Sequence, residues 1–237
     1  MCGSCLSKPT PINADYYCFA CQTPFLNPHP LDEQGLCGLC RRGLTGFDAA
    51  YSFGSYENEL RELIHLFKYA GVETLSRPLG KLLLIALPRE QRFDVVVPMP
   101  LHWRKQWRRG FNQSELLARE ISRAWKMPLK RAVRRVKNTA AQAGLTNAKR
   151  RDNVSGAFRV KHALQGMRVL LVDDVMTTGA TAGACAAALK RVGASHVTLL
   201  TLARVDRRLA ATVRHEISVP ESIILGSFED AKSGSIA

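Results

Sequence analysis

The chain has 237 residues, with 34 Lys and Arg against 20 Asp and Glu, which gives a formal net charge of +14 at pH 7. This length accommodates one full domain and a small accessory module, and the longest apolar run, near 82–87, is too short to span a membrane. The amino terminus lacks a basic segment followed by an apolar one, so no secretory signal is predicted and we expect a cytoplasmic protein. Seven cysteines in a reducing compartment favour metal ligation over disulfide formation.

Three Cys-x-x-Cys pairs occupy the first 40 residues. Fifteen residues separate the second pair from the third, a spacing typical of a closed, structural Zn²⁺ site with four thiolates. The stretch between the two pairs is rich in turn residues and cannot form a hydrophobic core, so the bound metal would stabilise this module in place of a core. The predicted zinc ligands are Cys18, Cys21, Cys37 and Cys40. The first pair, Cys2 and Cys5, is either half of a second site or a competitor for this one, and the spacing leaves both open.

The stretch that follows predicts alternating strands and helices. The hydrophobic pattern indicates a strand at 49–56, a helix capped by Asn58 and ending near 71, a second helix at about 73–87, and a buried strand at 94–98. His65 and Lys68 fall outside the apolar stripe of the first helix, so we expect both to be solvated, with contact to a ligand as the alternative for either.

A strongly basic segment comes next. Between His102 and Arg151 there are fifteen Lys or Arg against two acids, and such density attracts polyanions, nucleic acid among them. Charge alone gives no base specificity, so a polyphosphate ligand and a simply solvated surface remain alternatives. We interpret 102–113 as a loop that forms an anion site before a helix capped by Asn112, with Glu115 as capping-box partner. Its candidate ligands for a diphosphate or a DNA backbone are Arg104, Lys105, Arg108 and Arg109.

Two tryptophans, Trp103 and Trp107, alternate with these cations. Aromatic side chains interleaved with arginine are typical of surfaces that stack single-stranded bases, although both rings also fit a core. The polar, basic stretch 138–153 is predicted to be a mobile segment that could fold over a neighbouring site.

A second strand–loop–helix unit lies at 169–191. An apolar, β-branched run predicts a strand buried on both faces, followed by two adjacent acids, a loop of small hydroxylated residues and a helix from about 181. Such units cradle phosphate with backbone N–H groups and a helix N-terminus. An ordinary capped turn would not explain two carboxylates at the end of a buried strand, where an unpartnered charge is costly. Further strands are expected at 156–160 and 196–203, and a solvated tail at 229–237.

The sequence from Val172 to Thr181, Val-Asp-Asp-Val-Met-Thr-Thr-Gly-Ala-Thr, resembles the phosphoribosyl-pyrophosphate (PRPP) signature of type I phosphoribosyltransferases. The resemblance implies an α/β fold with a parallel twisted sheet flanked by helices. It also implies that the paired acids hold the ribose hydroxyls, that the Thr/Gly loop wraps the 5-phosphate, and that Mg²⁺ accompanies PRPP. The implied PRPP-binding residues are Asp173, Asp174, Val175, Met176, Thr177, Thr178, Gly179, Ala180 and Thr181. No catalytic base is identified, since His102 alone in a basic segment is weak evidence.

Further motifs narrow the resemblance. These are Val-Pro-Met-Pro-Leu at 97–101, Arg-Arg-Gly-Phe-Asn-Gln-Ser at 108–114, Gln142-x-x-Leu145, Arg150-Arg151-x-Asn153 and Phe158. Together with the cysteine ribbon they resemble the ComF group, phosphoribosyltransferase-like proteins linked to DNA uptake and use in bacteria. The resemblance runs from residue 2 to about 204. Longer members carry four Cys-x-x-Cys pairs, so the three found here leave the first pair without an assigned role.

Taken together, the cysteine spacing, the resemblance and the loss of periodicity after about 208 predict three parts: a zinc ribbon at 1–47, a phosphoribosyltransferase-like domain at 48–210, and a partly flexible tail at 211–237. The basic segment with its tryptophans predicts single-stranded DNA as a partner, and the resemblance, through its link to DNA uptake, implies DNA-uptake helicases or recombination proteins as further partners. Two functions follow as hypotheses. The first is a PRPP-binding protein of DNA uptake or utilisation. The second is an active phosphoribosyltransferase of nucleotide salvage, which would transfer the phosphoribosyl group to a nitrogen acceptor with loss of pyrophosphate.

Overall fold

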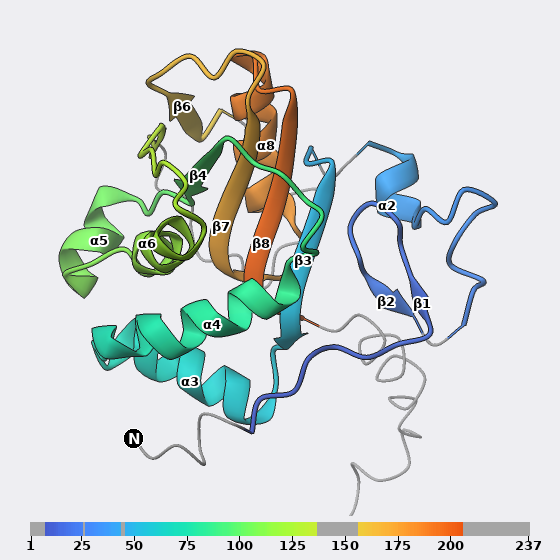
Figure 1. Cartoon of the computed structure of the whole chain (residues 1–237), viewed down its shortest axis with the longest axis horizontal. Helices are drawn as coiled ribbons and strands as arrows, with labels where there is room; N and C mark the ends of the chain where they lie inside the picture. Colours follow the sequence, from blue (N-terminus) through green and yellow to red (C-terminus); the bar gives the residue numbers. More distant parts are fainter. Residues whose placement is uncertain (1–7, 26, 44–45, 137–155, 206–237) are drawn as a thin grey trace, which may run out of the picture.

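A parallel sheet forms the centre of the protein. The computed structural model describes residues 8–25, 27–43, 46–136 and 156–205. In this part of the chain four parallel strands pair in the order β3-β8-β7-β4 (Figure 1). Their bounds are β3 Ala49–Ser55, β8 His196–Arg204, β7 Arg168–Met176 and β4 Val95–Pro98. Because the strands are parallel, their carboxyl ends share one edge of the sheet, where α/β folds bind ligands.

Strand β7 runs through the middle of the sheet and is apolar on both faces. Val169 and Leu171 pack into the core on one side, while Leu170 and Val172 pack into the core on the other. Successive side chains of a strand point to opposite faces, so a continuous apolar run fills both cores. The predicted doubly buried strand is confirmed, and it continues through the two acids as far as Met176.

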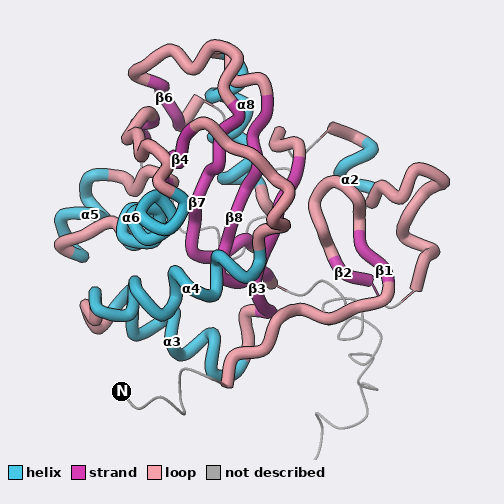
Figure 2. The backbone as a smooth tube through the Cα atoms, viewed as in Figure 1, coloured by secondary structure: helices cyan, strands magenta, loops and turns pink. Residues whose placement is uncertain are grey.

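Helices cover both faces of the sheet. Three helices pack on one face, and a fourth helix packs on the other beside a two-stranded antiparallel ribbon (Figures 1 and 2). The first three are α3 Asn58–Tyr69, α4 Ser76–Ala86 and α6 Gln113–Trp125, and the elements on the other face are α8 Ala180–Arg191, β5 Val133–Arg135 and β6 Phe158–Val160. None of the helices in the described ranges is long and apolar enough to cross a membrane.

The first helices differ from prediction at their starts. Asn58 is not the cap of α3, because Glu57 holds that position and makes no side-chain capping bond. Asn58 is instead the first helical residue, with a φ of 44°, a left-handed conformation that Asn tolerates better than most residues. The second helix begins as a 3₁₀ turn, η1 (Glu73–Leu75), which leads into α4.

The basic segment after β4 is helical, contrary to the predicted loop. Helix α5 (Trp103–Arg109) has no buried residue, so no apolar stripe marks it in the sequence. Gly110, with a φ of 79°, ends the helix in the left-handed conformation that glycine adopts without strain. The predicted cap of α6 is confirmed, since Asn112 Oδ1 accepts from the backbone N–H of Ser114 at 3.1 Å. Glu115 instead accepts hydrogen bonds from two arginines, Arg119 and Arg131.

The cysteine-rich part forms a small module beside the sheet. It contains strands β1 (Tyr16–Tyr17) and β2 (Pro24–Phe25), paired antiparallel, and the short helix α2 (Gly38–Arg41). Its buried cysteines belong to the same core cluster as the α8 face of the sheet. The pair Cys2 and Cys5, the predicted mobile stretch 138–153 and the predicted tail lie outside the described residues.

Candidate functional site

The two adjacent acids of β7 point to opposite sides of the sheet and have different surroundings. Asp174 Oδ1 lies 2.9 Å from Lys68 Nζ of α3, and both side chains are largely buried, 7% and 14% exposed. Burial opposes the charge of Lys68, but the carboxylate of Asp174 prevails and raises the lysine pKa above its usual value. Asp174 therefore forms a buried ion pair with Lys68 next to the site. Lys68, which was expected at a solvated face, is one of the residues of the site.

Asp173 faces the cavity at the carboxyl end of β7. Its Oδ1 accepts from Ser114 Oγ of α6 and from the backbone N–H of Asp174, both at 2.9 Å. Burial, and then the neighbouring Asp174 carboxylate, raise the pKa of Asp173 to about 7. A carboxyl group whose pKa lies near neutrality is typical of ligand sites, because an incoming cation or hydroxyl group shifts its ionisation.

The loop between β7 and α8 has the geometry of an anion cradle. Gly179 has a φ of 77° and precedes the first residue of the twelve-residue helix α8. A Cβ added to Gly179 would sit 3.6 Å from the ring of Phe47, an ordinary contact, so the positive φ is what favours glycine here. The backbone N–H groups and the positive end of the helix dipole at such a terminus favour a phosphate group.

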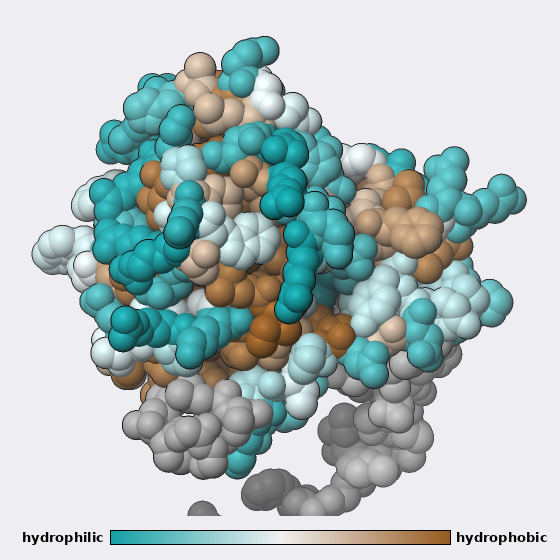
Figure 3. Space-filling view, viewed as in Figure 1, coloured by the Kyte–Doolittle hydropathy of each residue, from teal (hydrophilic) through white to brown (hydrophobic). Residues whose placement is uncertain are grey.

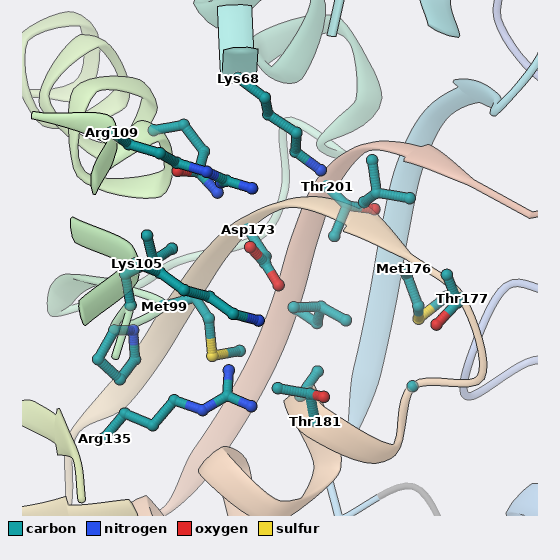
Figure 4. Close-up of a pocket in the computed structure, with 17 residues that line it drawn as sticks. Lys68, Met99, Lys105, Arg109, Arg135, Asp173, Met176, Thr177, Thr181 and Thr201 are labelled. Carbon is teal, nitrogen blue, oxygen red and sulfur yellow. The ribbon is translucent and has the colours of Figure 1, made fainter. Parts of the chain in front are cut away.

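A cavity of about 320 Å³ joins these elements. Among the residues that the structure describes, four cations line it, whereas Asp173 is the one acid that does. The cations come from three separate elements and are Lys68 of α3, Lys105 and Arg109 of α5, and Arg135 of β5. Figure 4 shows Lys105, Arg109 and Arg135 extending toward Asp173. This excess of positive charge in a partly buried site favours a ligand that carries several negative charges.

Of the nine residues implied by the PRPP signature, six line the cavity: Asp173, Val175, Met176, Thr177, Gly179 and Thr181. Asp174, Thr178 and Ala180 are not among its lining residues. Asp174 instead holds Lys68, which does line it, and the hydroxyl of Thr178 accepts from the backbone N–H of Ala180 at 3.4 Å. These two therefore support groups that reach the cavity.

The four predicted metal ligands converge at a second site. The sulfur atoms of Cys18, Cys21, Cys37 and Cys40 all lie within 4.8 Å of one another, and three of their separations are 3.5, 3.6 and 3.7 Å. A tetrahedral Zn²⁺ with bonds of about 2.3 Å requires sulfur separations of about 3.8 Å. Four mostly buried thiols at this spacing could hold such a metal ion. Cys2 and Cys5 are outside the described residues.

One buried arginine joins this cysteine cluster to the sheet. Arg204, at the end of β8 and 2% exposed, donates to the backbone carbonyls of Cys21 and Gln22 and to the hydroxyl of Thr23. The same hydroxyl lies 2.8 Å from the sulfur of Cys21. In the sheet, Arg204 pairs with Met176, which lines the cavity. The cysteine module is thus fixed to the strand edge that carries the site.

Comparisons with known proteins agree with this arrangement. The model of the phosphoribosyl transferase domain family matches residues 108–229. The chain is 35% identical to "Competence protein F" of Haemophilus influenzae over 178 residues, 71% of this chain and 78% of that protein. The "DNA utilization protein YhgH" of Escherichia coli K12 is 35% identical, over 71% of this chain and 77% of that protein. The chain belongs to the ComF family. It is also 29% identical to "Competence protein ComFC" of Bacillus subtilis, over 86% of this chain and 84% of that protein.

The family assignment establishes the fold class: a phosphoribosyltransferase fold with a parallel sheet, preceded by a module whose four cysteines are consistent with a zinc ribbon. A glutamine PRPP amidotransferase from Bacillus subtilis is among the similar solved structures. Its TM-score is 0.39 at 22% identity, and the match covers 54% of this chain and 26% of that one.

Helix α5 of this ComF protein has two faces. Lys105 and Arg109 point into the cavity. The aromatic residues face solvent instead, with Trp103 58% exposed and Trp107 86% exposed, and the guanidinium of Arg104 lies 5.2 Å from the Trp103 ring centroid. Figure 3 shows strongly hydrophilic side chains mixed with paler ones over this part of the surface. His102, the weak candidate base, is buried and caps α5 by accepting from the backbone N–H of Arg104 at 3.4 Å.

Two residues of the site were missed by sequence reasoning, and a third, Lys68, was expected at a solvated face. Arg135 lies on a three-residue strand too short to show a period, and its guanidinium is 5.6 Å from the Phe158 ring centroid. Ser114, which donates to Asp173, follows the Asn112 cap and resembles any polar residue of a first helical turn. A signal for Lys68 existed, because it lies four residues after the fully buried Ile64 and so shares its face of α3.

Proposed function

We propose that this ComF protein binds PRPP, or a related ribose 5-phosphate ligand, in the cavity at the end of β7 and acts in DNA uptake or utilisation. The observation that carries the proposal is the convergence of four cations and one carboxylate beside the loop that precedes α8. PRPP has a 5-phosphate, a ribose with two free hydroxyls and a diphosphate, so it offers several anionic groups and hydroxyl donors to one cavity.

The chemistry of the cavity supports a place for each part of PRPP. The loop from Thr177 to Thr181 suits the 5-phosphate, since backbone N–H groups and a helix N-terminus bind anions. Ionised Asp173 can accept from the ribose hydroxyls. Lys105 and Arg109, together with Arg135, suit the diphosphate. Mg²⁺ is usually held by one or two carboxylates and substrate phosphates, and Asp173, with the phosphates of PRPP, would fit that pattern.

The solvent-facing side of α5 supports contact with single-stranded DNA. Trp103 and Trp107 are exposed, and exposed aromatic rings beside arginine stack on bases of any sequence. The outward cations, Arg104 and Arg108, would neutralise phosphates. The names of the similar Haemophilus influenzae and Escherichia coli proteins refer to competence and DNA utilization, which agrees with such a partner. A DNA-uptake helicase or recombination protein as a further partner stays a prediction of the family resemblance.

Active phosphoribosyl transfer is the second candidate function. A second cavity of about 310 Å³ shares Pro100, Leu101 and Arg135 with the first, so the site has room for an acceptor beside the PRPP position. Incubation with PRPP, Mg²⁺ and each nucleobase in turn, followed by measurement of pyrophosphate, tests it directly. Pyrophosphate released with one base supports the transferase, whereas none with any base favours the binding function alone.

The two faces of α5 allow a matched test of the proposal. Lys105→Ala with Arg109→Ala, and Arg104→Ala with Arg108→Ala, each remove two positive charges from the same helix. We expect the first pair to lose PRPP affinity in calorimetry. The second should keep PRPP affinity. It should make the negative slope of log DNA affinity against log salt shallower by about 1.4, at about 0.7 per phosphate contact.

Trp107→Ala should weaken DNA binding without changing the slope, because stacking releases no counterions. If both pairs lose PRPP alike and neither alters DNA binding, the division of the helix into two functional faces is wrong. If wild-type protein binds no single-stranded DNA at low salt, the DNA part of the proposal fails.

A further inference from the structure

A further cleft with a distinct composition lies at the end of the sheet opposite the PRPP cavity. We name it the amino-end cleft. It has a volume of about 540 Å³ and lies where α4 leads into β4 and where α6 ends. The lining residues that matter here are Arg89, Arg92, Phe93, Asp94, Trp125 and Lys126.

The amino-end cleft is separate from the PRPP cavity. Asp94 of the cleft and Met99 of the cavity are joined by five residues of extended chain, about 17 Å at 3.3 Å per residue. Trp125 of the cleft and Gln113 of the cavity lie at the two ends of α6, about 18 Å apart at 1.5 Å per residue. The distances along β4 and along α6 agree, so a ligand bound in the amino-end cleft does not touch the residues of the PRPP cavity.

An aromatic pair forms part of the cleft wall. The rings of Phe93 and Trp125 stack, with centroids 6.2 Å apart and planes inclined by 22°. Both side chains pack partly against the helix-side core while also lining the cleft. Flat aromatic surfaces that remain accessible in a polar cleft are suited to stacking a planar ring of a ligand.

The charge of the amino-end cleft is positive. Arg89, Arg92 and Lys126 are exposed cations that line it. Asp94, the one acid in the described part of the cleft wall, is already bound by Arg168, through the backbone N–H at 2.7 Å and the guanidinium at 3.1 Å. The acid is thereby neutralised within the protein, and the three exposed cations give the cleft an excess of positive charge that suits an external anion.

We infer that the amino-end cleft binds a nucleotide unit, with the base against the Phe93–Trp125 pair and the phosphate among the three cations. Stacking on aromatic rings beside arginine and lysine is the common means of holding a base together with its phosphate. The unit is either a free nucleotide or one nucleotide of a single strand, because both offer the same base and phosphate. The site is additional to the PRPP cavity and does not depend on it.

Fluorescence of Trp125 gives a local test. The chain has three tryptophans, so Trp103→Phe with Trp107→Phe leaves Trp125 as the only one in the full-length protein. We expect saturable quenching when this protein is titrated with adenosine 5′-monophosphate or with a twelve-nucleotide oligothymidylate. Quenching by the mononucleotide identifies a free nucleotide as a ligand, and quenching by the oligonucleotide alone identifies a strand.

The cleft variant is Arg92→Ala with Lys126→Gly in the same background. Lys126 has a φ of 50°, so glycine fits its backbone conformation and the variant should fold. Loss of two charge-assisted contacts should weaken nucleotide binding by roughly tenfold or more. The matched control is Arg77→Ala with Lys81→Ala, which removes two exposed charges from α4 and should leave the affinity unchanged.

Three results would overturn the inference: no quenching by either ligand, equal quenching in the cleft variant, or inorganic phosphate binding as tightly as the nucleotide. PRPP titrations of the same proteins separate this inference from the proposed function. The cleft variant should keep PRPP affinity. If no nucleotide binds in the cleft, the proposed PRPP site is unaffected. If the wild-type protein binds no PRPP, the nucleotide titrations still test the cleft.

Discussion

Asp174→Asn removes the charge that balances Lys68 beneath the cavity. The lysine side chain is 14% exposed and its Nζ lies 2.9 Å from Asp174 Oδ1, so the substitution leaves a buried ammonium without its closest carboxylate. Breaking a buried ion pair by removing one partner costs about 3–5 kcal/mol. Asp173 is also close enough to favour the charge of Lys68, which places the expected loss near the lower figure, about 3 kcal/mol. For a protein of this size that loss lowers Tm by about 6–12 °C.

Thermal unfolding followed by circular dichroism measures this effect in the absence of ligand. Lys68→Met and the Lys68→Met, Asp174→Asn double variant complete a double-mutant cycle. The double variant should be more stable than Asp174→Asn alone, because it buries neither charge. A Tm for Asp174→Asn within 2 °C of wild type, or single effects that simply add in the double variant, would refute the buried-pair reasoning.

Three further predictions concern the rest of the site. Cys18→Ser should abolish bound zinc, while Cys2→Ser should retain it; metal analysis showing loss in the second variant and not the first would contradict the ligand assignment. Arg204→Met should increase the rate at which a chelator removes the metal and should lower Tm. Arg204→Lys should bring the rate and Tm only part of the way back to the wild-type values, because lysine lacks the guanidinium fork. PRPP binding should tighten from pH 6 to 8 with proton release, because the pKa of Asp173 is raised to about 7 and the ionised form accepts the ribose hydroxyls. Calorimetry in two buffers of different ionisation enthalpy measures the number of protons released on binding. Asp173→Asn is the control, because it should lack the protons that Asp173 releases.

The raised pKa of Asp173 also sets the direction of a stability change. A carboxyl group that holds its proton more tightly in the folded state stabilises the fold below its unfolded pKa of about 3.9 and loses that contribution as pH rises through about 7. Unliganded wild type should therefore lose stability over this range, and Asp173→Asn should lose less.

The elements with a strong local pattern were predictable from the sequence. The apolar run of β7 and the Asn112 cap of α6 carry their own signals, and both predictions are confirmed. The cysteine spacing predicted a cluster, and the four sulfur atoms converge as expected. These features depend on residues close in sequence, so short-range patterns determine them.

Features that depend on tertiary packing could not be predicted from the sequence. Helix α5 buries no residue and so has no period to detect. Lys68 is buried because Asp174, more than a hundred residues away in the chain, lies opposite it in the folded state. The same holds for Arg135, which reaches the cavity only through the pairing of β5 with β6. Side chains recruited by distant partners become visible only when the fold brings those partners together.

The most direct test of the PRPP site is calorimetric titration of PRPP with Mg²⁺ into wild type, Asp173→Asn and Asp94→Asn. The last is the same chemical change at an exposed acid on the far end of the sheet, and its surface ion pair contributes little to stability. The account predicts saturable binding to wild type and Asp94→Asn, with affinity reduced about tenfold or more in Asp173→Asn. Wild type that binds no PRPP, or Asp173→Asn that binds it as tightly as wild type, would contradict the assignment of this cavity.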